Sequence, residues 1–139
     1  MNSLFVKPED KFEIKFVSSF SKTNPNILYV DFDLEGLKKQ NVDNDLANVV
    51  ENTVFFRSPT YGDASKILDK SIHLGDDNIT VSLSEIRKKR LITLLLDWDL
   101  VENGEKIPAN ANTVELLHPL VASVIMLKLD KTLEERGLL

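Results

Sequence analysis

Three close pairs of aspartates are the residues whose type and spacing could bind a cation: Asp31 with Asp33, Asp76 with Asp77, and Asp97 with Asp99. Asp31 and Asp33 would project from the same face of a strand, and paired carboxylates can hold a hard cation. Ion-binding loops usually add further oxygen ligands and a glycine turn, which are missing here. The segment DNDLANVVE has some aspartate spacing of a calcium loop but lacks its glycine. We therefore interpret Asp31 and Asp33 as the solvent-facing side of an edge strand and predict no metal site.

The two histidines, His73 and His118, are the candidates for acid–base chemistry. A general base needs a nucleophile or an orienting group nearby, and the sequence supplies neither. The chain has no cysteine, which excludes disulfides, thiolate catalysis and cysteine-based zinc sites. It also lacks the common phosphate-binding, dinucleotide-binding, serine-hydrolase and zinc-protease motifs. The sequence thus predicts a protein that is not an enzyme and has no catalytic residue and no cofactor.

The composition is that of a globular protein with an acidic balance. The chain has 139 residues, 42% hydrophobic and 28% charged, with a formal net charge of -5. This length favours one domain over residues 1–139, with the alternative of a β part (1–57) loosely joined to a helical part (58–139). The negative charge argues against nucleic acid as a partner. The basic cluster Arg87–Arg90 is interpreted as a solvated helix face, with an acidic partner surface as the alternative.

Two absences bear on where the protein is expected to act. The first ten residues lack the apolar core of a signal peptide. The longest apolar run, Leu120–Leu127, is interrupted by Ser123 and is far shorter than the ~20 residues that cross a bilayer. We therefore expect a soluble intracellular protein with no membrane partner.

A short antiparallel β element is predicted over about residues 11–34 and 54–57. Phe12, Ile14 and Phe16 alternate with charged residues, which is typical of a half-buried strand. The turn-forming segment SKTNPN follows, and a second strand over residues 27–34 would complete a hairpin. Residues 34–52 have a loose helical spacing and remain ambiguous, whereas 54–56 read as a third strand.

The rest of the chain is predicted to be helical, which gives an α+β fold. The expected helices cover about residues 60–72, 82–98, 112–118 and 119–135. A capping box of Thr60 and Asp63 opens the first, and Ser82 with Glu85 opens the second. Asn112 with Glu115 would cap the third, which should end at His118 because Pro119 follows; Pro119 can begin the fourth.

The last predicted helix is apolar around most of its circumference. Such a helix is either central in the domain or covered by a partner, which could be another copy of the chain or a second protein. The size of the domain favours a partner slightly, because few other helices are present to surround it. Val121 and Ile125 are the positions where a charged substitution would separate these alternatives.

Two segments carry a resemblance to a known family. The stretch LITLLLDWDL–VENGEKIP, followed by NTVELLHP, resembles the C-terminal half of tail assembly chaperones from long-tailed bacteriophages. The matching positions are Leu95, Trp98, Leu100, Gly104, Pro108, Val114, Leu116 and Leu117. Upstream, FFRSPTYGDASKI is similar to the segment that opens the helical part of such chaperones, matched by Arg57, Pro59, Thr60 and Asp63. The resemblance covers roughly residues 54–130, and none of the matched positions is catalytic.

The resemblance implies a chaperone that binds the phage tape measure protein, the tail tube protein or both, and keeps them soluble during virion assembly. It would act in the cytoplasm of the infected host and be absent from the mature virion. The alternative is a structural component of the tail, baseplate or neck that stays in the particle. The candidate partner-binding residues are Trp98, Val121, Ile125, Leu129, Arg87 and Arg90. Trp98 is expected to end a helix and bury its rings while its indole N–H reaches a carbonyl of the following turn.

Overall fold

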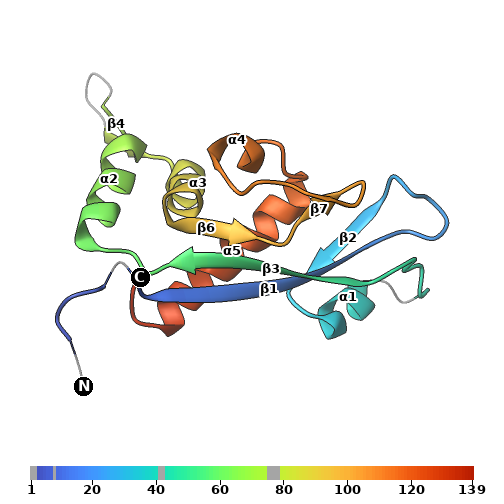
Figure 1. The fold of residues 1–139 in the computed structure, drawn as a ribbon. Helices are drawn as coiled ribbons and strands as arrows, with labels where there is room; N and C mark the ends of the chain where they lie inside the picture. The colour runs from blue at the N-terminus through green and yellow to red at the C-terminus, as the bar shows by residue number, and fades with distance from the viewer. Residues whose placement is uncertain (1–2, 8, 41–42, 75–78) are drawn as a thin grey trace.

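A four-stranded antiparallel sheet is the centre of the chain's α+β fold. The structure, a computed structural model, describes residues 3–7, 9–40, 43–74 and 79–139, and the strand order within them is β2-β1-β3-β6. The strands are β1 (Lys11–Phe20), β2 (Leu28–Asp31), β3 (Val50–Arg57) and β6 (Leu95–Trp98). The helices are α1 (Leu34–Gln40), α2 (Tyr61–Ser71), α3 (Leu83–Leu94), α4 (Ala111–Val114) and α5 (Pro119–Glu135). Helix α5 crosses one face of the sheet, and α2, α3 and α4 lie beyond its β6 edge (Figure 1).

The first hairpin forms where the alternating pattern predicted it. Phe12, Ile14 and Phe16 of β1 point into the main hydrophobic cluster, as period-two alternation requires. Phe20 pairs with Leu28 across the predicted turn, which confirms the hairpin. The second strand is shorter than predicted because the chain turns into α1 soon after it.

The ambiguous segment after β2 contains helix α1. Asp33 caps this helix, since its carboxylate accepts the N–H of Gly36 at 2.8 Å. Strand β3 then begins at Val50 instead of near Val54, because residues 50–53 also pair with β1. The pairing partner, which lies far away in the sequence, extends this strand beyond the apolar run that was visible in the sequence.

The predicted helix over residues 82–98 is too long. Ser82 caps α3 as predicted, accepting the N–H of Glu85 at 3.3 Å, but the helix ends at Leu94. The next four residues form β6, which pairs antiparallel with β3 and places Trp98 opposite Val54. By periodicity, a short apolar run fits a helix and a buried strand equally well. Here the run forms a strand because the edge of β3 offers backbone groups for it to pair with.

The other predicted helix starts are confirmed in one case and shifted in another. The capping box that opens α2 is confirmed by reciprocal hydrogen bonds between Thr60 and Asp63. The third predicted helix (112–118) is the short α4, capped by Asn110 and Thr113 instead of Asn112 and Glu115. Two small hairpins were not predicted: β4 (Ile72–Leu74) with β5 (Ile79–Val81), and β7 (Val101–Glu102) with β8 (Glu105–Lys106).

Helix α5 has the predicted bounds. Pro119 is its first residue, and His118 caps it through Nδ1, which accepts the N–H of Leu120 at 3.1 Å. His118 therefore begins this helix and does not end the preceding one. Ile125 and Leu129 are fully buried on the side that meets the sheet and α3.

One hydrophobic cluster joins the two halves of the sequence. Its buried members are Ile14, Phe16, Val30, Val54, Phe56, Leu91, Leu94, Trp98, Val114, Ile125, Leu129 and Leu133. The sheet, α3, α4 and α5 all contribute to it, so residues before and after position 58 share one core. In the part of the chain that the structure describes, no helix combines the length and the apolarity needed to cross a membrane.

Candidate functional site

Trp98, the first predicted partner-binding residue, is part of the core. Its side chain is 1% exposed, and the indole Nε1 donates a hydrogen bond to the carbonyl of Ile107 at 2.6 Å. The predicted bond to a following turn is therefore present, although Trp98 belongs to a strand and not to a helix end. A buried tryptophan with a satisfied N–H offers no surface to a partner.

The predicted positions on α5 are likewise turned inward. Ile125 and Leu129 are fully buried, and Val121 is half-buried against the same cluster. The outer side of α5 instead exposes Leu120 and Leu127. The three predicted side chains thus hold α5 on the sheet, and a docking role for Ile125 or Leu129 would require the core to open.

Arg87 and Arg90 connect two helices of the same chain. Arg87 Nε lies 3.2 Å and Arg90 Nη1 2.5 Å from the carboxylate of Asp130 on α5. Lys88, between them, forms an ion pair with Glu115. Two carboxylates, Asp130 and Glu115, thus offset half of the four positive charges of the cluster, and the pairs with Asp130 hold α3 against α5.

The residues considered for chemistry in the sequence do not form a site. Asp97 pairs with Lys106 at 3.0 Å, and the carboxylate of Asp99 accepts the N–H of Thr53 at 2.8 Å. Asp76 and Asp77 lie outside the described residues, as does the side chain of His73. Among the residues that are described, no group of three or more histidines and carboxylates is arranged to hold a metal ion.

An apolar cleft lies between α2, α3 and the C-terminal residues. Its volume is about 280 Å³. It is lined by Pro59, Ala64, Ile67, Leu68, Ile86, Arg90, Leu133, Leu138 and Leu139. Ile67 and Leu133 are buried in its wall, whereas Leu68 is 47% exposed. We call this the α2–α3–α5 cleft.

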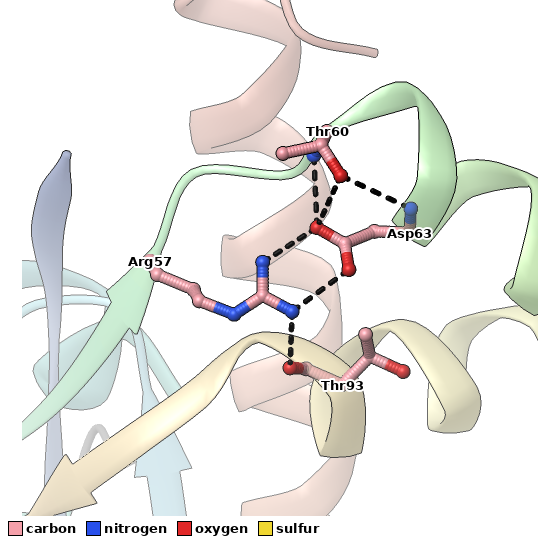
Figure 2. Close-up of polar contacts among 4 residues, drawn as sticks. All are labelled: Arg57, Thr60, Asp63 and Thr93. Atoms are coloured by element: carbon pink, nitrogen blue, oxygen red, sulfur yellow. Dashed lines mark hydrogen bonds and ion pairs between the residues drawn. The ribbon is translucent and has the colours of Figure 1, made fainter. Parts of the chain in front are cut away.

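A polar network at the end of β3 fixes the α2 wall of the cleft (Figure 2). Arg57 Nη1 and Nη2 donate to the two carboxylate oxygens of Asp63 at 2.5 and 2.8 Å. Arg57 Nη2 also donates to the carbonyl of Thr93 on α3 at 3.3 Å. Because Asp63 belongs to the capping box with Thr60, one arginine ties the sheet to the start of α2 and the end of α3.

The same network shifts the ionisation of its two charged groups. The hydrogen bonds from Arg57 hold the pKa of Asp63 well below its usual range, against an opposing effect of burial. The hydrogen bonds to Asp63 correspondingly raise the pKa of Arg57. Both groups are therefore charged at neutral pH, and the network has a structural role with no proton to exchange.

Sequence reasoning did not find the cleft, although it found parts of its walls. The resemblance singles out Arg57 and Pro59, the capping box also marks Asp63, and Arg90 stands out as a basic residue and a candidate partner contact. No protein-family model, curated protein or solved structure matches the chain.

Proposed function

We propose that this protein is a non-catalytic tail assembly chaperone that binds an apolar segment of the tape measure protein, the tail tube protein or both. The observation that carries the proposal is the α2–α3–α5 cleft, whose lining is apolar apart from Arg90. Contiguous apolar surface on a soluble protein commonly marks an interaction site. A chaperone of this kind would use the cleft to cover client side chains until assembly.

The charges at the cleft favour a neutral, apolar occupant. Arg90 lines the cleft, but its guanidinium is already paired with Asp130 at 2.5 Å. An anionic ligand would have to compete with that carboxylate, which is largely buried beside it. Apolar side chains require no such exchange, so they are the better match for this surface.

The form of the cleft suits the apolar side of a helix. Leu68 is half-exposed at the surface of α2, and Leu139 lies on the opposite side with 57% exposure. A client helix that places apolar residues at positions i, i+3 and i+4 would contact both. Tape measure proteins are expected, by the resemblance, to supply such segments.

Co-expression with the tape measure protein or the tail tube protein tests the proposal. Leu68→Glu places a charge in the cleft, whereas the matched change Leu116→Glu alters an 83% exposed leucine outside it. We expect wild-type chain and Leu116→Glu to keep the client soluble and to co-purify with it. Leu68→Glu should bind at least about tenfold more weakly, which corresponds to about 1.4 kcal/mol.

The alternative, a structural component of the tail, predicts a different result in the particle. Mass spectrometry of purified virions should not detect a chaperone, whereas a structural protein would be present at fixed copy number. Retention of the chain in virions, together with equal client binding by wild type and Leu68→Glu, would refute the proposed function.

A further inference from the structure

The N-terminal arm, residues 3–7 and 9–10, carries apolar side chains that no other described part of the chain covers. Leu4 is fully exposed and Phe5 is 82% exposed. The arm extends from the start of β1 away from the body of the protein (Figure 1). Two adjacent large apolar side chains held in water are unfavourable, so they indicate a surface that is buried in another state of the protein.

The arm leaves the body of the protein next to the α2–α3–α5 cleft. Its last residue is Asp10, whose backbone carbonyl accepts the N–H of Ser58 at 2.8 Å. Pro59, the residue after Ser58, lines the cleft. The base of the arm and the wall of the cleft are therefore joined by this hydrogen bond. One corner of the molecule carries both an apolar segment and an apolar depression.

We propose that the arm of one copy inserts Leu4 and Phe5 into the α2–α3–α5 cleft of a second copy, and that the exchange is reciprocal. A two-fold symmetric interface needs the same patch on both copies to be self-complementary. A corner that holds both arm and cleft meets this requirement and closes as a dimer, with no exposed end that could extend into a filament.

The dimensions of the arm and the cleft are compatible with this exchange. A cavity of roughly 150 Å³ accommodates benzene, and the cleft volume is about 280 Å³, so a phenylalanine ring and a leucine side chain can share it. Four residues lie between Phe5 and Asp10, and an extended chain spans up to about 3.3–3.6 Å per residue. Because the Lys7–Asp10 turn is kept, the two steps from Lys7 to Phe5 extend roughly 7 Å beyond it, which reaches a copy whose cleft adjoins the arm.

A second copy is a better occupant than the chain's own arm. Within one chain, the N–H of Asp10 donates to the carbonyl of Lys7 at 3.0 Å, and this turn precedes β1. Leu4 and Phe5, which precede this turn, are exposed to solvent and do not line the cleft of their own chain. Exchange between copies buries both surfaces without undoing this turn.

Sedimentation velocity over a concentration series tests the exchange. The wild-type mass should rise toward twice the monomer value, as should that of the control Leu116→Glu. The arm variant, Leu4→Ser with Phe5→Ser, and the cleft variant Leu68→Glu should each remain monomeric. An equimolar mixture of the two variants should regain a dimer, because one intact arm then faces one intact cleft.

Cysteine cross-linking supplies a second readout that does not depend on Leu68→Glu folding well. The chain has no cysteine of its own. With diamide as oxidant, a mixture of Phe5→Cys and Leu68→Cys chains should give a disulfide-linked heterodimer. Phe5→Cys mixed with Tyr61→Cys should not, because Tyr61 is exposed but does not line the cleft.

Three results would overturn the inference: a wild-type chain that stays monomeric, association that persists without Leu4 and Phe5, or a disulfide formed within one chain in a Phe5→Cys, Leu68→Cys double variant. The arm and a client would compete for the same cleft, but arm exchange is measured on the protein alone and client binding is measured separately. A chain that exchanges arms but binds no tail protein would keep this inference and refute the proposed function, and the converse result would do the reverse.

Discussion

At the scale of single residues, the side chains that stand out in the sequence are structural. Trp98 fills the core, and Asp63 with Arg57 fixes the start of α2. Both had been noted in the sequence, Trp98 as a partner contact and Asp63 as a helix cap. Apolarity marks core and interface residues alike, which is why Trp98, Ile125 and Leu129 are also candidates for a partner surface; the predicted burial of the Trp98 rings is confirmed.

Trp98→Ala should lower the free energy of unfolding by about 3–5 kcal/mol, as large-to-small core substitutions do. It also leaves the carbonyl of Ile107 without its donor. The matched substitution Leu96→Ala, at a 40% exposed position of the same strand, should cost less than about 1 kcal/mol. Urea denaturation monitored by circular dichroism measures both; similar losses for the two variants would contradict the buried position of Trp98.

Asp63 should make the stability of the protein depend on pH in the acid range. The pKa of Asp63 is lower in the folded chain than its unfolded value of about 3.9, so protonation favours the unfolded chain. The stabilisation is fully present above about pH 5 and is lost as the pH falls below roughly 4.

Asp63→Asn should cost about 2 kcal/mol at neutral pH, less than for a fully buried pair because Arg57 is partly exposed. It should also flatten the acid limb of a plot of melting temperature against pH. Glu105→Gln, on the exposed β7–β8 hairpin, serves as the control and should follow wild type. An unchanged acid limb in Asp63→Asn would contradict the role given to this carboxylate.

At the scale of elements, the type of element was predictable where local signals were strong. The Thr60–Asp63 capping box marked the start of α2, and Pro119 marked the start of α5. The end of α3 was not predictable in the same way, because the switch to β6 depends on pairing with β3 from another part of the chain. Long-range pairing overrides local helical periodicity at such points.

The turn of the β7–β8 hairpin depends on Gly104. Its φ of 80° follows a φ of 52° at Asn103, the combination that a tight hairpin turn needs. Gly104→Ala should therefore destabilise the protein by about 1–2 kcal/mol, although no atom lies near the added methyl group. Gly62→Ala, in α2 with only a side-chain oxygen of Thr60 at 3.6 Å, should be neutral or stabilising by up to about 1 kcal/mol in a thermal melt. Equal effects would argue against a strained turn.

At the scale of the whole molecule, the α+β class could be predicted, but the cleft could not. The sheet and helices follow from alternating and helical patterns, and α5 has the bounds that its sequence predicted. The cleft is assembled from residues near positions 59–68, 86–90 and 133–139. No local pattern connects these segments, because only the packing of α2 and α3 beside the end of α5 brings them together.

Hydrogen–deuterium exchange of the chain with and without bound tape measure protein tests the central claim most directly, because it locates the binding surface. We expect client binding to slow amide exchange in residues 59–68 and 133–139, with no change in the exposed β7–β8 hairpin. Protection that appears on the hairpin or on the outer side of α5, with none at the cleft, would contradict the claim that the α2–α3–α5 cleft binds the client.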